Sequence, residues 1–151
     1  MGWPSFLPFR DASTPRKWYD GACHCGKFQF TFQHPIVEDG FEVLTCNCSI
    51  CTAKGALYVY IPDPAVDFKF TKGSLKELAE YRFDRKAVGH LFCGSCGSNL
   101  LEDILLGEQK VIAVNARFIK GIDLNAIKLR HLDGRSLDSV IDEAMKDINA
   151  P

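Results

Sequence analysis

The arrangement of the cysteines constrains this chain more than any other feature of its sequence. Seven cysteines fall into three short clusters, which are Cys23-His24-Cys25, Cys46-Asn47-Cys48-Ser49-Ile50-Cys51 and Cys93-Gly94-Ser95-Cys96. No cysteine lies outside these clusters. An odd number of cysteines fits a framework of disulfides poorly, and close spacing of this kind is typical of metal ligands. The sequence therefore predicts metal binding, and thiolate ligands favour zinc.

The first and third clusters offer two thiols each. In an extended chain residues i and i+2 point to the same face, so Cys23 and Cys25 face one way. The C-x-x-C motif of Cys93 and Cys96 brings its two thiols together in a tight turn. Four thiolates complete a closed tetrahedral site, which is typical of structural zinc. Such a site ties together distant stretches of chain and contributes directly to folding stability.

The middle cluster offers three thiols. Cys46 and Cys48 share a face of an extended segment, and a turn after Cys48 brings Cys51 to the same metal. Three protein ligands plus an exchangeable one are typical of catalytic zinc. A thiol that binds such a metal loses its proton and becomes a nucleophile at neutral pH. The sequence thus predicts two Zn2+ ions per chain, of which the second is open to a substrate.

Two alternatives remain for the middle cluster. In the first, a histidine closes the site and makes it structural, and the candidates are His24, His34, His90 and His131. His24 points away from its neighbouring thiols in an extended segment, so it is able to reach toward the second metal. In the other alternative, the three thiols are oxidised or exchange metal, and the protein is a thiol redox or zinc-exchange protein.

Hydrophobic periodicity predicts a mainly β domain with one C-terminal amphipathic helix. Alternating or buried apolar runs indicate strands near residues 27–32, 41–46, 56–61, 66–70, 80–83, 88–92, 110–115 and 127–132. We expect a turn at Tyr19-Asp20-Gly21, a hairpin turn at Asp39-Gly40 and a short helical turn over residues 74–78. From Ser136, which suits an N-cap, the apolar residues follow helical spacing.

A length of 151 residues suits one domain with a single core. We expect residues 1–17 to form an irregular arm, residues 18–135 the zinc-binding β domain, and residues 136–151 a helix packed on that domain. The apolar stripe of the helix is expected to lie on the sheet. The alternative is a contact between two copies of the helix, which would make the protein a homodimer.

Composition excludes several classes of partner. A net charge of -1 gives no electrostatic reason to expect nucleic acid or an anionic membrane surface. No apolar run has the length of a membrane span. Pro4 and Pro8 interrupt the apolar N-terminus, so it suits an export signal poorly. We therefore expect a cytoplasmic protein, because a reducing compartment keeps thiols available for metal.

Three motifs in this order resemble a known family. They are Gly21-x-Cys23-x-Cys25-Gly26, Cys46-x-Cys48-Ser49-x-Cys51 and Phe92-Cys93-x-x-Cys96-Gly97. Over most of its length the chain resembles the glutathione-dependent formaldehyde-activating enzyme family (GFA domain), which has centromere protein V-like members. The resemblance implies an Mss4-like fold of zinc-pinned antiparallel sheets, shared with a small Rab-GTPase chaperone. It also implies a structural zinc at Cys23, Cys25, Cys93 and Cys96, and a catalytic zinc at Cys46, Cys48 and Cys51.

The reaction of that family joins glutathione to formaldehyde, forms S-hydroxymethylglutathione and is classed as a carbon–sulfur lyase. The resemblance therefore implies that glutathione is a substrate and that its zinc-bound thiolate attacks the aldehyde carbon, although another thiol or aldehyde fits the same chemistry. Lys54 and Arg117 are candidates to bind the glutathione carboxylates, and solvated surface charges explain both residues equally well. No residue stands out as the proton donor. The alternative function is a non-catalytic binding module stabilised by zinc.

Overall fold

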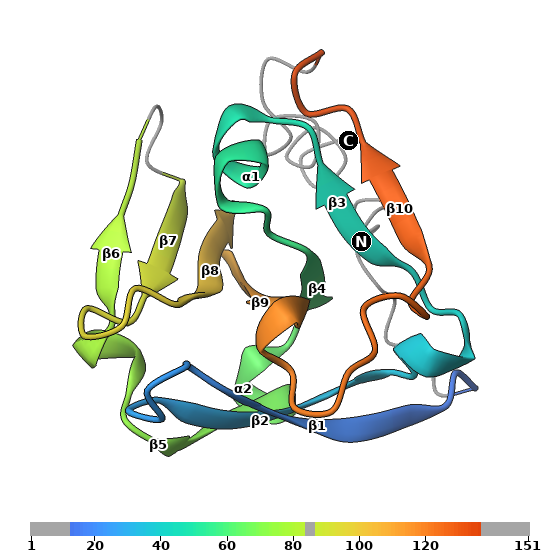
Figure 1. The fold of residues 1–151 in the computed structure, drawn as a ribbon, viewed down its shortest axis with the longest axis horizontal. Coiled ribbons are helices and arrows are strands. Elements are labelled where there is room, and N and C mark those ends of the chain that lie inside the picture. The colour runs from blue at the N-terminus through green and yellow to red at the C-terminus, as the bar shows by residue number, and fades with distance from the viewer. Residues whose placement is uncertain (1–12, 84–86, 137–151) are drawn as a thin grey trace.

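Two β-sheets face each other across an aromatic core (Figure 1). The computed structural model describes residues 13–83 and 87–136. The smaller sheet is antiparallel and contains, in spatial order, β1 (Arg16–Ala22), β2 (Gln29–Pro35) and β5 (Phe68–Lys72). The aromatic side chains that alternate along β2 explain this placement, because a half-buried strand turns every second residue toward a core.

The larger sheet has seven strands. In spatial order they are β10 (Leu129–Leu132), β3 (Val43–Cys46), β4 (Tyr58–Ile61), β9 (Gln109–Asn115), β8 (Asn99–Leu106), β7 (Val88–Phe92) and β6 (Ala79–Tyr81). All neighbouring strands are antiparallel except β10 and β3, which are parallel. The helical segments are short: α1 (Ser49–Lys54), α2 (Pro64–Asp67), and the 3-10 turns η1 (Val37–Asp39), η2 (Leu75–Glu77) and η3 (Ala116–Phe118). The predicted mainly β fold is confirmed.

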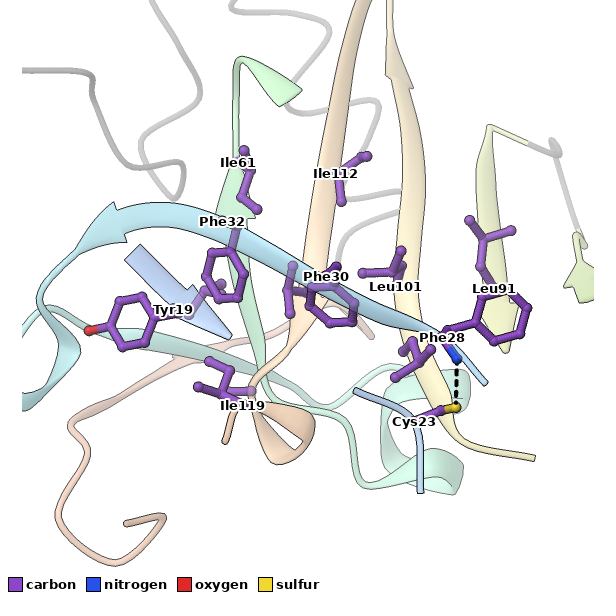
Figure 2. Close-up of a cluster of buried hydrophobic side chains, with 14 of the residues drawn as sticks. Tyr19, Cys23, Phe28, Phe30, Phe32, Ile61, Leu91, Leu101, Ile112 and Ile119 are labelled. Carbon is purple, nitrogen blue, oxygen red and sulfur yellow. Dashed lines mark hydrogen bonds between the residues drawn. The ribbon is translucent and has the colours of Figure 1, made fainter. Parts of the chain in front are cut away.

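The main core lies between the two sheets. Phe28, Phe30 and Phe32 are almost completely buried, and the ring of Phe32 stacks on Tyr19 with centroids 5.4 Å apart. Figure 2 shows these rings on one side and aliphatic side chains of the larger sheet, such as Leu101, on the other. Gly21 belongs to the same layer, because a Cβ built there would lie 2.5 Å from the ring of Phe30.

A second, smaller core covers the opposite face of the larger sheet. It contains Leu44, Ala56, Tyr58, Tyr60, Ile104, Val111 and Ala113, and Cys51 of α1 packs against it. The central strands are therefore buried on both faces, which explains why β4 appears in the sequence as a continuous apolar run. This second face is the one that carries the middle cysteine cluster.

Three local predictions are wrong. Tyr19-Asp20-Gly21 lies within β1 instead of forming a turn, and the strand begins at Arg16, inside the expected irregular arm. Asp39-Gly40 does not form a hairpin, because Gly40, at φ 99°, ends η1 and the flanking strands belong to different sheets. Val66 lies in α2 and not in the strand that follows it.

The other expectations have mixed outcomes. The short helical turn over residues 74–78 is confirmed by η2. The strand β8 is not among the predicted strands, because Leu100 and Leu101 are adjacent and both buried, which hides any alternation. The helix expected over residues 136–151 lies outside the described residues except for Ser136, and residues 1–12 also lie outside them. In the part of the chain that is described, no helix combines the length and the hydropathy that crossing a membrane requires.

Candidate metal centres

The first and third cysteine clusters form one group, which we call the four-thiol group: Cys23, Cys25, Cys93 and Cys96. The Sγ atoms of Cys23 and Cys25 are 3.6 Å apart, those of Cys25 and Cys93 are 3.7 Å apart, and all four lie within 4.8 Å of one another. A tetrahedral zinc bound at about 2.3 Å separates its sulfur ligands by about 3.8 Å. The donors and their spacing therefore fit zinc.

Similar but not identical turns present the two halves of the four-thiol group. Between β1 and β2, Cys23 N donates to Phe28 O at 3.1 Å and Gly26 N donates to Cys23 O at 3.0 Å. Between β7 and β8, Cys93 N donates to the Ser98 carbonyl at 3.0 Å and Gly97 N donates to Cys93 O at 2.7 Å. Gly26 and Gly97 have φ of 78° and 77°, a left-handed conformation that favours glycine. This explains the glycine after each cysteine pair.

The four-thiol group joins the two sheets. Cys23 and Cys93 are buried, and Phe28 N donates to Cys23 Sγ at 3.3 Å (Figure 2). One half of the group leaves the smaller sheet after β1 and the other leaves the larger sheet after β7, so a metal here would link the two layers.

The middle cluster forms a second group, which we call the three-thiol group: Cys46, Cys48 and Cys51. Cys46 ends β3, Cys48 is the N-cap of α1, and Cys51 lies in α1. Cys48 N donates to Cys46 Sγ at 3.4 Å, and Gly55, at φ 61°, ends the helix. All three sulfurs lie within 4.8 Å of one another, and all three residues are partly exposed. The strand-to-helix turn therefore assembles three zinc-compatible donors at the surface.

Charge is unevenly shared within the three-thiol group. Hydrogen bonds from Cys46 and then Cys51 lower the pKa of the Cys48 thiol to about 2. The same contacts act in reverse on Cys51, whose pKa is raised by its hydrogen bonds with Cys46 and Cys48. One thiolate is thus stabilised by two thiols. Deprotonating all three requires a nearby cation, which is the role of a metal.

The four histidines lie elsewhere. His34 is buried and its Nδ1 donates to Pro35 O at 2.8 Å, and His90 is buried beside Glu102. His24 and His131 are exposed. Within residues 13–83 and 87–136, no histidine, aspartate or glutamate places a ligand atom within 4.8 Å of all three sulfurs.

A polar cluster that the sequence analysis does not predict lies beside the three-thiol group. Lys54 Nζ donates to Asn99 Oδ1 at 3.3 Å and lies 5.4 Å from the ring centroid of Phe92. Asn99 Nδ2 donates to the hydroxyl of Tyr58 at 3.2 Å. Burial lowers the pKa of Lys54, while the negative charges of Glu102 and Cys51 act in the opposite direction. The half-buried ammonium of Lys54 is therefore part of this polar cluster and is not simply a solvated surface charge.

Arg117, the other predicted substrate contact, is hydrogen-bonded to the end of α1. Its Nε donates to Gly55 O at 2.6 Å, and its backbone N donates to Asn115 Oδ1 at 3.2 Å. The side chain is exposed. Lys54 and Arg117 therefore lie at the same end of α1. Lys54 follows Cys51 by three residues, and Arg117 is hydrogen-bonded to Gly55, which follows Cys51 by four.

Asn47, between two of the three thiols, is bound to the chain after β10. Its Nδ2 donates to Asp133 Oδ1 at 2.7 Å, and its Oδ1 accepts from Arg135 N at 3.0 Å. Arg135 Nε also donates to Asn47 O at 2.5 Å. The parallel pairing of β10 with β3 makes these contacts possible, since it aligns Leu132 with Cys46.

Comparison with known proteins agrees with this architecture. The family described as "Glutathione-dependent formaldehyde-activating enzyme" matches residues 18–126, which is most of the chain. The crystal structure of a Rhodobacter sphaeroides protein is similar with a TM-score of 0.58 and 23% identity, and the match covers 74% of this chain and 99% of that chain. At this identity the second match shows a shared fold. Since the family match spans all three cysteine motifs, the chain belongs to the glutathione-dependent formaldehyde-activating enzyme family.

Proposed function

We propose that this protein joins a thiol to an aldehyde by forming a carbon–sulfur bond, with glutathione as the thiol and formaldehyde as the aldehyde. The reverse reaction is that of a carbon–sulfur lyase. The observation that carries the proposal is the three-thiol group itself, because its sulfurs converge within 4.8 Å and are partly exposed. In the four-thiol group Cys23 and Cys93 are buried, whereas Cys25 and Cys96 are exposed. Four donors fill a tetrahedral site and three leave one position open, which supports a structural role for the four-thiol group and a substrate-binding role for the three-thiol group.

Each group is proposed to hold one Zn2+. The four-thiol group supplies Cys23, Cys25, Cys93 and Cys96, and the three-thiol group supplies Cys46, Cys48 and Cys51. Zinc bound by three thiolates supplies a Lewis acid that lowers the pKa of an incoming thiol. The thiol donors support the choice of metal, and the family's name supports the choice of substrate.

The remaining tasks fall to side chains around the end of α1. As the carbon–sulfur bond forms, the carbonyl electron pair moves to oxygen, and negative charge develops there. The Lys54 ammonium is held beside the three-thiol group by Asn99 and offers positive charge close to that position. Arg117 retains guanidinium N–H groups beyond the one bound to Gly55 O, and these suit a glutathione carboxylate.

The experiment that tests the proposal compares zinc content and glutathione binding in wild type and Cys48→Ser. We expect two zincs in wild type and about one in the variant, which keeps its fold and loses glutathione binding. Ser49→Ala, an exposed neighbour at the start of α1, is the matched control and should keep both properties. If Cys48→Ser unfolds, the three-thiol group is structural and the assignment is wrong. If wild type holds two zincs but binds no glutathione, the protein is better described as a non-catalytic binding module.

A further inference from the structure

Asn115 is a buried polar side chain at the end of β9. It is 2% exposed, and its amide group is hydrogen-bonded to the backbone of three separate segments. Its Nδ2 donates to Asn99 O at 2.9 Å, and its Oδ1 accepts from Leu57 N at 3.4 Å and from Arg117 N at 3.2 Å. Because a buried amide is costly to leave unpaired, these contacts hold the three segments in fixed positions around it.

The contact with Asn99 leads to Lys54. Asn99 begins β8, and its Oδ1 accepts from Lys54 Nζ at 3.3 Å while its Nδ2 donates to the Tyr58 hydroxyl at 3.2 Å. The ammonium also lies 5.4 Å from the ring centroid of Phe92, within the range of a cation–π contact. Since Asn115 holds the backbone of Asn99, it fixes the residue whose side chain holds the Lys54 ammonium.

The contact with Arg117 N caps the 3-10 turn η3. Asn115 is the N-cap residue of this turn, and its side chain accepts from the second residue inside it. The Arg117 guanidinium reaches back to the end of α1, where Nε donates to Gly55 O at 2.6 Å. Leu57 N, the third partner of the amide, belongs to the chain that leaves α1. The same amide therefore fixes both the turn that carries Arg117 and the chain that leaves the helix Arg117 contacts.

Neither of these two cations is neutralised by an ion pair. Within residues 13–83 and 87–136, the ion pairs involve other basic side chains and not Lys54 or Arg117. Both cations lie at the end of α1, the helix that carries Cys51 of the three-thiol group. A thiol substrate that carries negative charge suits such a surrounding better than a neutral one.

We propose that Asn115 positions both cations for the substrate and so sets the preference of the protein for a thiol that carries carboxylates. The inference rests on the proposed function, in which Arg117 binds a glutathione carboxylate and Lys54 faces the charge that develops on oxygen. Asn115 is a positioning residue in this scheme. It acts on affinity through Arg117 and on rate through Asn99 and Lys54, and the two effects pass through opposite ends of its amide.

The test compares glutathione with its diethyl ester, which keeps the thiol and neutralises both carboxylates. Calorimetry measures binding to zinc-loaded protein, and exchange NMR measures the rate of carbon–sulfur bond formation at saturating glutathione and formaldehyde. Wild type should bind glutathione roughly 10-fold more tightly than the ester. Asn115→Ala should keep its zinc, bind both thiols with the affinity of the ester, and form the bond roughly 10–100-fold more slowly.

Asn115→Ser separates the two ends of the amide. A serine hydroxyl is a good N-cap and still accepts from Arg117 N, but its shorter side chain no longer donates to Asn99 O. This variant should keep the wild-type preference for glutathione over the ester and show the lowered rate. Asn125→Ala, at an exposed position in the turn between η3 and β10, is the matched control and should equal wild type in both measurements.

The outcomes distinguish this inference from the proposed function. If Asn115→Ala weakens glutathione and ester binding equally and keeps their ratio, Asn115 only supports the fold and the inference is overturned. A wild type that does not distinguish the two thiols also overturns it and leaves the proposed function standing. A wild type that binds neither thiol overturns both. If Asn115→Ala does not fold, Asn115→Ser decides, and a wild-type rate in that variant overturns the inference.

Discussion

Ser98 connects the two halves of the four-thiol group to each other. Its hydroxyl accepts a hydrogen bond from His24 N at 3.0 Å and lies 3.1 Å from Cys96 Sγ. His24 belongs to the turn after β1 and Ser98 to the turn after β7, so one hydroxyl links both layers. The sheets are therefore joined by a polar contact as well as by the proposed metal.

Replacement of Ser98 by alanine should weaken this junction. The change leaves His24 N without its partner, and because His24 is exposed the loss is that of an ordinary hydrogen bond, about 0.5–1.5 kcal/mol. We expect a lower free energy of unfolding in urea and an unchanged content of two zincs. Ser95→Ala is the control, because Ser95 is exposed in the same turn and only accepts from Lys27 at 3.5 Å. Equal stability of the two variants would show that the Ser98 bond contributes nothing.

Asn47 should control the metal affinity of the three-thiol group without binding metal itself. Asn47→Ala removes the two side-chain hydrogen bonds that fix the backbone between Cys46 and Cys48 to residues 133–135. Groups that orient metal ligands typically change metal affinity by about 10–100-fold. Competition with a chelator should therefore show one zinc released more readily and the other unchanged.

Asn125→Ala is the matched control for Asn47, because Asn125 is exposed in the turn between η3 and β10. Its zinc release should match that of wild type. Equal weakening of both zincs in Asn47→Ala would mean that the fold as a whole has loosened, and unchanged release would mean that the loop needs no support from residues 133–135.

The cysteine groups could be predicted because their geometry is largely local. A C-x-C segment and a C-x-x-C turn each converge whatever the surrounding fold, and the structure brings together the thiols that spacing had grouped. The alternation of Phe28, Phe30 and Phe32 likewise fixes one face of β2 without reference to its partners.

The polar cluster could not be predicted, because it depends on pairing between distant strands. Asn99 on β8 and Tyr58 on β4 come together only through the strand order β4-β9-β8, and no local pattern in the sequence indicates that order. The hairpin expected at Asp39-Gly40 failed for a related reason. The chain does turn at Gly40. However, β3 pairs in parallel with β10, which lies more than eighty residues later in the chain, so β3 belongs to the larger sheet and forms no hairpin with β2.

His34 makes the stability of the protein depend on pH. The ring is buried, its Nδ1 donates to Pro35 O, and it meets Phe41 edge-on at 5.2 Å. Burial lowers the pKa of His34 from 6.5 to about 4, and the nearby positive charge of Arg16 acts in the same direction. The unfolded chain therefore binds a proton below about pH 6.5 that the folded protein does not bind until about pH 4.

Because of this difference in pKa, His34 makes the folded protein less stable as the pH falls. The contribution of neutral His34 to the free energy of unfolding is fully present above pH 6.5. It declines as the pH falls toward 4, by about 1.4 kcal/mol per pH unit and about 3 kcal/mol in all. His34→Gln lacks the titration, so its urea stability should decline less steeply over this range than that of wild type. Acid also removes zinc from thiolates, but this loss is common to both proteins and cancels in their difference. His131→Gln, at an exposed position on β10, should follow wild type, and parallel curves for wild type and His34→Gln would show that His34 titrates alike in both states.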